Sequence, residues 1–224
     1  MSLILDGTTG VPVTTVTGTL PVANGGTGVT TSTGSGANAL ATSPTLTTPV
    51  LSGSVTGTYT LAGTPTMGAS LITSGTAVAS TSGTSIDFTG IPSWVKRITV
   101  MYKGVSTNGA SDYLVQLGAG SPTTTGYTGS SSIITTGIAS TNYTTGFGVY
   151  NNTTSATVIN GGMTIVTLGS NVWAAFGVLL MSNSAGSMPN GGSVTLAGTL
   201  DRVRITTVNG TDTFDAGSIN ILYE

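Results

Sequence analysis

The sequence predicts an all-β protein in which an extended N-terminal arm precedes a jelly-roll-like β-sandwich. Three observations lead to this expectation. Between Asp6 and Asp87 there is no charged residue, and glycine, threonine and serine dominate this stretch. From residue 76 onward, short segments rich in Val, Ile, Tyr and Thr are separated by Asn-Gly, Pro and Gly-Gly turn signals. Many short strands with such turns favour two packed sheets and no substantial helix.

The clearest strand lies within residues 85–109. Ile98, Val100 and Tyr102 fall on one side of an extended chain, and the residues between them fall on the other. This period of two indicates a half-buried strand. Asn108-Gly109 follows it and tolerates the positive φ that a hairpin turn requires.

Further strands are predicted from the same kinds of signal. We expect them at 77–80, 85–88, 95–105, 113–117, 132–136, 145–150, 157–167, 172–181, 193–196, 202–208 and 218–223. Turns are expected between them at 108–109, 121–122, 151–152, 160–162, 189–192 and 209–210.

One of these strands, 172–181, is apolar on both faces. It is therefore expected to be central in a sheet, either covered on each side or buried between subunits. The larger aromatic residues in or beside strands are expected in the core: Trp94, Tyr102, Trp173, Phe176 and Phe214.

The arm, residues 1–75, is expected to associate with copies of itself. Prolines at positions 12, 21, 44, 49 and 65 and frequent glycine disfavour helix, and the sparse Val and Leu residues cannot form a core alone. A disordered tail is the alternative, but disordered segments are usually rich in charge and poor in β-branched residues. We therefore expect a homotrimer, with residues 76–224 forming a C-terminal sandwich knob.

The composition excludes several kinds of chemistry. The chain has no His and no Cys, which removes His-based triads, thiolate metal sites and haem ligation through these residues. Its five Lys and Arg residues cannot form the basic surface that nucleic acid requires. No apolar run approaches the roughly 20 residues of a membrane-spanning helix. We expect no cofactor, no metal site, no nucleic-acid partner and no membrane insertion.

The carboxylates do not form a convincing catalytic pair. Asp212 and Asp215 are close in sequence, but Asp212 follows the Asn209-Gly210 turn, where Asp commonly bonds its own backbone. A polysaccharide hydrolase would need two carboxylates facing each other across a groove. The cations Arg202 and Arg204 are expected on solvated strand faces or in ion pairs with Asp87 and Asp201. The protein is therefore expected not to be an enzyme.

Three segments resemble pieces of bacteriophage virion proteins. The run LPVANGGTG at 20–28 resembles a segment that recurs in phage tail fibres, and residues 85–109 and 200–224 resemble a C-terminal domain carried by many phage tail and virion proteins. This resemblance implies a protein on the surface of the phage particle, synthesised in the host cytoplasm, with an arm held by other virion proteins and a knob that attaches to host surface polysaccharide. The alternative is a head fibre or capsid-decorating protein without a dedicated receptor, and a depolymerase spike ranks third.

Receptor contact, if this role holds, is expected in residues 119–156. The segment is uncharged and combines Tyr with Asn, Ser and Thr, which offer ring faces and hydrogen-bonding groups to a sugar. The alternative for each Tyr is packing against a neighbouring loop. The predicted receptor-binding residues are Tyr127, Asn142, Tyr143, Tyr150 and Asn151.

Overall fold

The computed structural model describes residues 72–151, 154–155 and 157–224, so the predicted arm up to residue 71 lies outside the described residues. The described part contains strands and turns and no helix. The strands are β1 (Thr73–Ser74), β2 (Val78–Ala79), β3 (Ile86–Thr89), β4 (Arg97–Thr107), β5 (Tyr113–Ala119), β6 (Ser121–Pro122), β7 (Thr128–Ile134), β8 (Ile138–Tyr143), β9 (Phe147–Val149), β10 (Ile159–Gly169), β11 (Val172–Met181), β12 (Gly186–Thr195), β13 (Arg202–Thr207) and β14 (Phe214–Tyr223).

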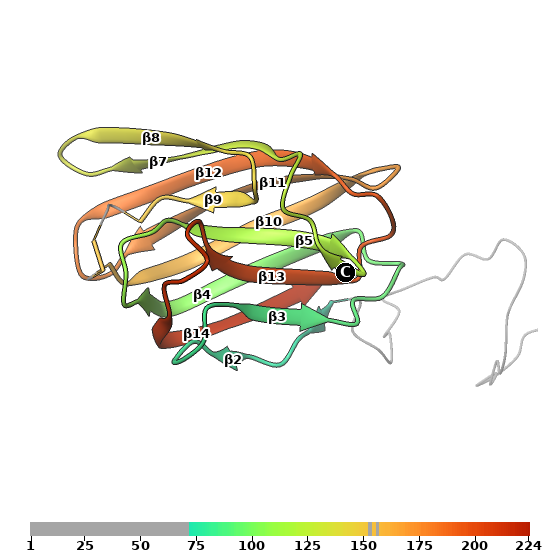
Figure 1. The fold of residues 1–224 in the computed structure, drawn as a ribbon, viewed down its shortest axis with the longest axis horizontal. Helices are drawn as coiled ribbons and strands as arrows, with labels where there is room; N and C mark the ends of the chain where they lie inside the picture. Colours follow the sequence, from blue (N-terminus) through green and yellow to red (C-terminus); the bar gives the residue numbers. More distant parts are fainter. Residues whose placement is uncertain (1–71, 152–153, 156) are drawn as a thin grey trace, which may run out of the picture. The chain divides into compact units, whose positions relative to one another are not determined.

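The strands form two antiparallel sheets in a sandwich-like arrangement. The nine-stranded sheet has the order β1-β14-β4-β10-β11-β12-β7-β8, with β2 also paired to β14, and the five-stranded sheet has the order β3-β13-β5-β6, with β9 paired to β5. Figure 1 shows β3, β13 and β5 lying over the β14, β4 and β10 side of the larger sheet, while the β7–β8 hairpin forms its other edge. Several pairings are nested in sequence: β4 with β14, β5 with β13, β7 with β12 and β10 with β11.

The core lies between the two sheets and follows the predicted period of two. On β4, Ile98, Val100 and Tyr102 are buried, as expected from the sequence, and Arg97 is exposed. On β13 of the facing sheet, Val203 is likewise fully buried. Alternating residues of both sheets therefore point inward, which is the arrangement that lets two sheets share one apolar interior.

Two of the expected turns are instead parts of long strands. Asn160-Gly161-Gly162 lies within β10, and the 189–192 segment lies within β12. At the first site the register of β10 against β4 shifts between Ile159 and Gly161, and the Asn160 side-chain oxygen accepts a hydrogen bond of 2.7 Å from the Gly104 N–H. Ile159 and Gly161 pair with Val105 and Tyr102, so the extra residue of this β-bulge lies in β4 near Gly104, and Asn160 and Gly161 face it from β10.

Two aromatic residues expected in the core are exposed, so this part of the prediction is wrong. Trp94 precedes β4 and packs its ring against Tyr223, with 6.0 Å between the ring centroids. Phe176 lies on β11 and points away from the other sheet, because the inward positions of that strand are taken by alternate residues such as Ala175. Tyr102, Trp173 and Phe214 are buried, as predicted.

The inward orientation of alternate β11 residues gives a stability prediction. Leu179 is fully buried, and replacing it by Ala removes contacts that the surrounding sheets cannot restore. We expect Leu179→Ala to lower the free energy of unfolding by about 2–5 kcal/mol. The exposed Leu168 is the matched control, and Leu168→Ala should change stability by less than about 0.5 kcal/mol in urea unfolding. Equal losses for the two variants would contradict the assignment of the core.

Candidate functional site

An open depression of about 430 Å³ lies on the larger sheet, where β12, β7 and β8 run side by side. It brings together three of the predicted receptor residues, Tyr127, Asn142 and Tyr143. The other lining residues are Thr128, Gly129, Ser130, Thr144 and Gly191. Its lining is uncharged, and its polar groups are hydroxyls, an amide and the backbone.

The strand register explains why the depression forms. Phe176, Gly191, Ser130 and Asn142 are successive cross-strand partners from β11 to β8. Partners in antiparallel strands share one face of the sheet. Gly191 has no side chain, so the row is hollow next to the Ser130 and Asn142 side chains, which line the depression.

Tyr127 lines this depression with only a small part of its ring, because its side chain is 2% exposed. Its ring meets Phe147 edge-on, with 5.0 Å between centroids and 87° between planes. Its hydroxyl oxygen accepts a hydrogen bond of 2.8 Å from the Leu117 N–H. Burial raises the pKa of Tyr127 to about 12. The residue therefore links β7 to the facing sheet, and its ring faces are covered within the subunit.

Tyr143 is similarly enclosed and is 4% exposed. Its hydroxyl donates a 2.8 Å hydrogen bond to Oδ2 of Asp112, whose Oδ1 accepts one of 2.8 Å from the Asn151 N–H. Burial, and then the hydrogen bond to Asp112, raise the pKa of Tyr143. The ring rests on Gly148: a Cβ at that position would stand 2.2 Å from the ring carbons.

The remaining predicted receptor residues differ in exposure. Asn142 is exposed, and its side chain is free to face solvent over the depression. Asn151 is buried and donates from its amide to the Ser111 carbonyl at 3.0 Å. Tyr150 is partly buried and packs against the core. Neither Tyr150 nor Asn151 lines the depression. The sequence could not reveal which tyrosines turn inward, because that depends on the sheet packed against them.

The predicted ion pairs of the small sheet are present. Arg204 donates to both carboxylate oxygens of Asp87 at 2.8 and 2.9 Å, and Arg202 donates to Asp201 at 2.9 Å. The Arg202 guanidinium lowers the pKa of the Asp201 carboxyl. These cations are engaged with carboxylates of their own sheet.

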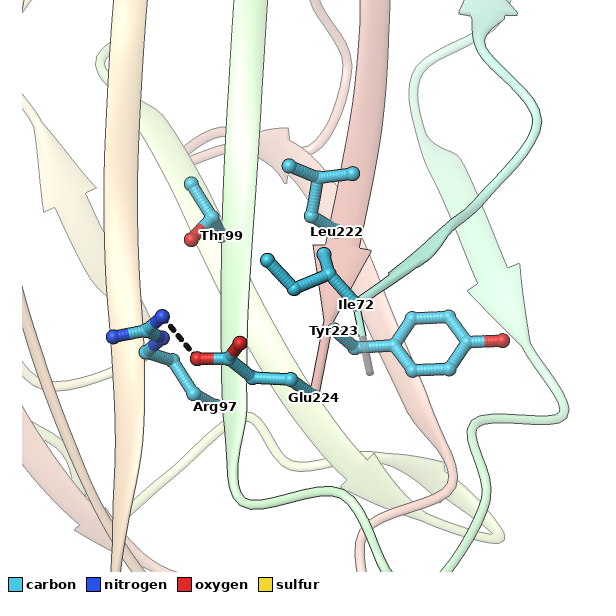
Figure 2. Close-up of a pocket in the computed structure, with 6 residues that line it drawn as sticks. All are labelled: Ile72, Arg97, Thr99, Leu222, Tyr223 and Glu224. Atoms are coloured by element: carbon cyan, nitrogen blue, oxygen red, sulfur yellow. Dashed lines mark ion pairs between the residues drawn. The ribbon is translucent and has the colours of Figure 1, made fainter. Parts of the chain in front are cut away.

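A second, smaller hollow lies on the larger sheet beside its C-terminal strand. Figure 2 shows the Arg97 guanidinium and the Glu224 carboxylate turned toward each other in an ion pair, with the Tyr223 ring pointing away from them. Ile72, Thr99 and Leu222 complete the lining. The ion pair occupies the charged groups of this hollow, which leaves an apolar floor.

Asp212 lies at a turn, as expected, but its carboxylate binds neighbouring residues and not its own backbone. Its carboxylate accepts hydrogen bonds from the Ser111 N–H at 3.0 Å and from the Asn209 amide at 2.6 Å. Its own N–H donates to Asn209 Oδ1 at 3.2 Å. Asp215 accepts a hydrogen bond from the Ser106 hydroxyl. Asp212 thus stabilises the loops at Ser111 and Asn209, and Asp215 links β14 to β4.

Within the described residues, no three Asp, Glu, His or Cys side chains gather where they could hold a metal ion. The same part of the chain contains no helix that could cross a membrane. Comparison with protein-family models, with curated proteins and with solved structures gives no match for this chain.

The contact between Gly148 and Tyr143 can be tested by substitution. Gly148→Ala should lower the free energy of unfolding by about 1–3 kcal/mol, because the new methyl group would overlap the ring. Gly137→Ala is the control, since nothing lies within 4 Å of a Cβ there. Chemical denaturation measures both. An unchanged midpoint for Gly148→Ala would contradict the described packing of Tyr143.

Proposed function

We propose that this chain is a non-enzymatic bacteriophage virion fibre protein whose sandwich knob attaches to host surface polysaccharide. The observation that carries the proposal is the open, uncharged depression over β12, β7 and β8, with the Ser130 hydroxyl and the Asn142 amide on its rim. Binding sites for small polar ligands combine an apolar surface with a few oriented hydrogen-bonding groups. The ring edges of Tyr127 and Tyr143, which line the depression, supply the apolar surface.

The sequence resemblance gives this site its context. In the proposed particle, residues 1–75 anchor the chain to other virion proteins and hold three copies together, and the sandwich faces outward. A shallow site binds each sugar weakly, but three sites on one fibre and many fibres on one particle raise the effective concentration and give an avidity about 10² or more above a single site.

The topology supports a jelly-roll-like description of the knob. Nested pairing of β4 with β14, β5 with β13, β7 with β12 and β10 with β11 is the pattern made by one long hairpin that is rolled into two sheets. The chain departs from the common arrangement in that the β10–β11 hairpin joins the larger sheet.

A head fibre or capsid-decorating protein is the second candidate. It is favoured by the burial of Tyr127 and Tyr143, which leaves fewer aromatic faces for a ligand than the sequence implied, and by the burial of the Asn151 amide. Such a protein would use the same self-associating arm and would need no receptor.

Binding to bacterial surface polysaccharide tests the proposal. The 224-residue chain should bind at least one of a panel of purified bacterial surface polysaccharides in biolayer interferometry with the sugar immobilised. Asn142→Ala should weaken this binding severalfold, because it removes the exposed amide of the depression.

Ser140→Ala is the matched control, because Ser140 is exposed on the same strand but does not line the depression. It should bind as the parent does. Equal binding by parent and Asn142→Ala would refute the assignment of the depression. No binding by the parent to any bacterial polysaccharide or to whole cells would refute host attachment and favour the decorating role.

A further inference from the structure

The outer face of β11 carries an apolar stripe formed by Phe176, Val178 and Leu180. These side chains are 57%, 52% and 53% exposed, and they alternate with inward residues such as Ala175 and Leu179. β11 is an interior strand of its sheet, paired with β10 and β12. The stripe therefore runs along the middle of a sheet face that no described element covers.

The stripe continues sideways onto the β7–β8 hairpin. Leu180, Ser187, Ile134 and Ile138 are successive cross-strand partners, so they share this face. Ile134 is 43% exposed and Ile138 is 77% exposed. Figure 1 shows β11, β12, β7 and β8 as neighbours along one side of the larger sheet. The exposed apolar side chains thus form one patch on this face, divided by Ser187 between Leu180 and Ile134.

This patch lies on a surface without charge. Residues 113–200 contain no Asp, Glu, Lys or Arg, and they include every residue of β7, β8, β10, β11 and β12. Soluble monomers rarely expose large connected apolar patches, and such patches usually mark an interaction surface.

The missing charge also restricts what can cover the patch. A partner that placed charged side chains against it would lose their hydration and find no counter-charge, which costs several kcal/mol per ion. A second copy of the chain presents the same uncharged apolar face and is always present at the same concentration. Interfaces between identical subunits are also the more apolar kind.

The size of the face suits such a contact. Four strands at about 4.8 Å spacing and up to ten residues of about 3.3 Å each cover about 19 by 33 Å, or about 600 Å² before side-chain relief is counted. A stable interface buries about 800 Å² per partner. The outer face centred on the β11 stripe is therefore close to the size required.

We propose that the β11 stripe packs against the β11 stripe of other copies of this chain. The contact lies in the sandwich, so it goes beyond the trimer contact proposed for the arm. A two-fold interface uses the same patch on both copies, so the stripe of one copy can pack against the stripe of the other.

Cysteine cross-linking tests this contact directly, because the chain has no cysteine of its own. Val178→Cys in the 224-residue chain should form covalent dimers under mild oxidation or with a short bismaleimide, and its thiol should react slowly with a maleimide dye before cross-linking. Val208→Cys is the matched control: Val208 is 51% exposed, against 52% for Val178, and follows β13 of the other sheet. Its thiol should react quickly and give no cross-link.

Three results of the cysteine experiment would contradict the stripe contact. A Val178→Cys thiol that reacts as fast as that of Val208→Cys and does not cross-link would mean that the stripe is solvent-exposed. A protected thiol without a cross-link would mean that the arm or a different chain covers it. Equal cross-linking of the two variants would mean random collision. Each of these results overturns the proposal. Leu180→Cys repeats the test at the next outward residue of β11.

Sedimentation of the parent chain separates this inference from the proposed function. A parent trimer without the Val178 cross-link would leave the arm-mediated trimer intact and remove only the stripe contact. A monomeric parent would remove both contacts. Neither result depends on polysaccharide binding.

Discussion

Scarcity of charge is the constraint on which the rest of this structure depends. Residues 113–200 form eight of the described strands without one charged side chain. The surface of this part therefore contacts water through hydroxyl, amide and backbone groups. The outward positions of its strands carry Ser, Thr, Asn, Gly and exposed aliphatic residues. The inward positions form an ordinary apolar core. A sheet built in this way has two faces that can both be buried, and only one of them is covered by the second sheet.

The few charged groups of the described residues are mostly used to hold the sandwich together. Asp112 joins the end of β8 to the loop after β9 by binding the Tyr143 hydroxyl and the Asn151 N–H. Asp87 and Arg204 pair across β3 and β13. The bonds of Asp112 fix the end of the β7–β8 hairpin beside the small sheet. The outer face formed by β7, β8, β10, β11 and β12 carries no charged residue.

Much of the fold could be predicted from residue patterns. β11 occupies residues 172–181 in both the prediction and the structure, because a long apolar run bounded by Ser170-Asn171 leaves little freedom. β8 is not among the predicted strands, since after Ile138 its residues are mostly small or polar, and all but Tyr143 are exposed. The glycines of β10 and β12 predict turns although they lie within strands, because glycine is also used where the backbones of neighbouring strands approach closely.

The candidate site was predictable only in part. Asn142 is exposed as a binding residue must be, but Tyr127 and Tyr143 point inward, toward Leu117 and Asp112. Side-chain direction on a short polar strand depends on register, and neither β7 nor β8 has an alternation that fixes its register from sequence. Phe176 was assigned to the core for the same reason: a strand that is apolar on both faces does not indicate which face the second sheet covers.

The dependence of self-association on salt tests the central claim most directly. Copies held together through uncharged apolar surfaces should associate equally well, or more tightly, when sodium chloride is raised from about 0.05 M to about 1 M, because screening shortens the Debye length to about 3 Å without affecting apolar burial. Sedimentation equilibrium of the 224-residue chain at both concentrations measures this. A fall of about tenfold or more in the association constant at high salt would contradict the account and would assign the contact to charged groups instead.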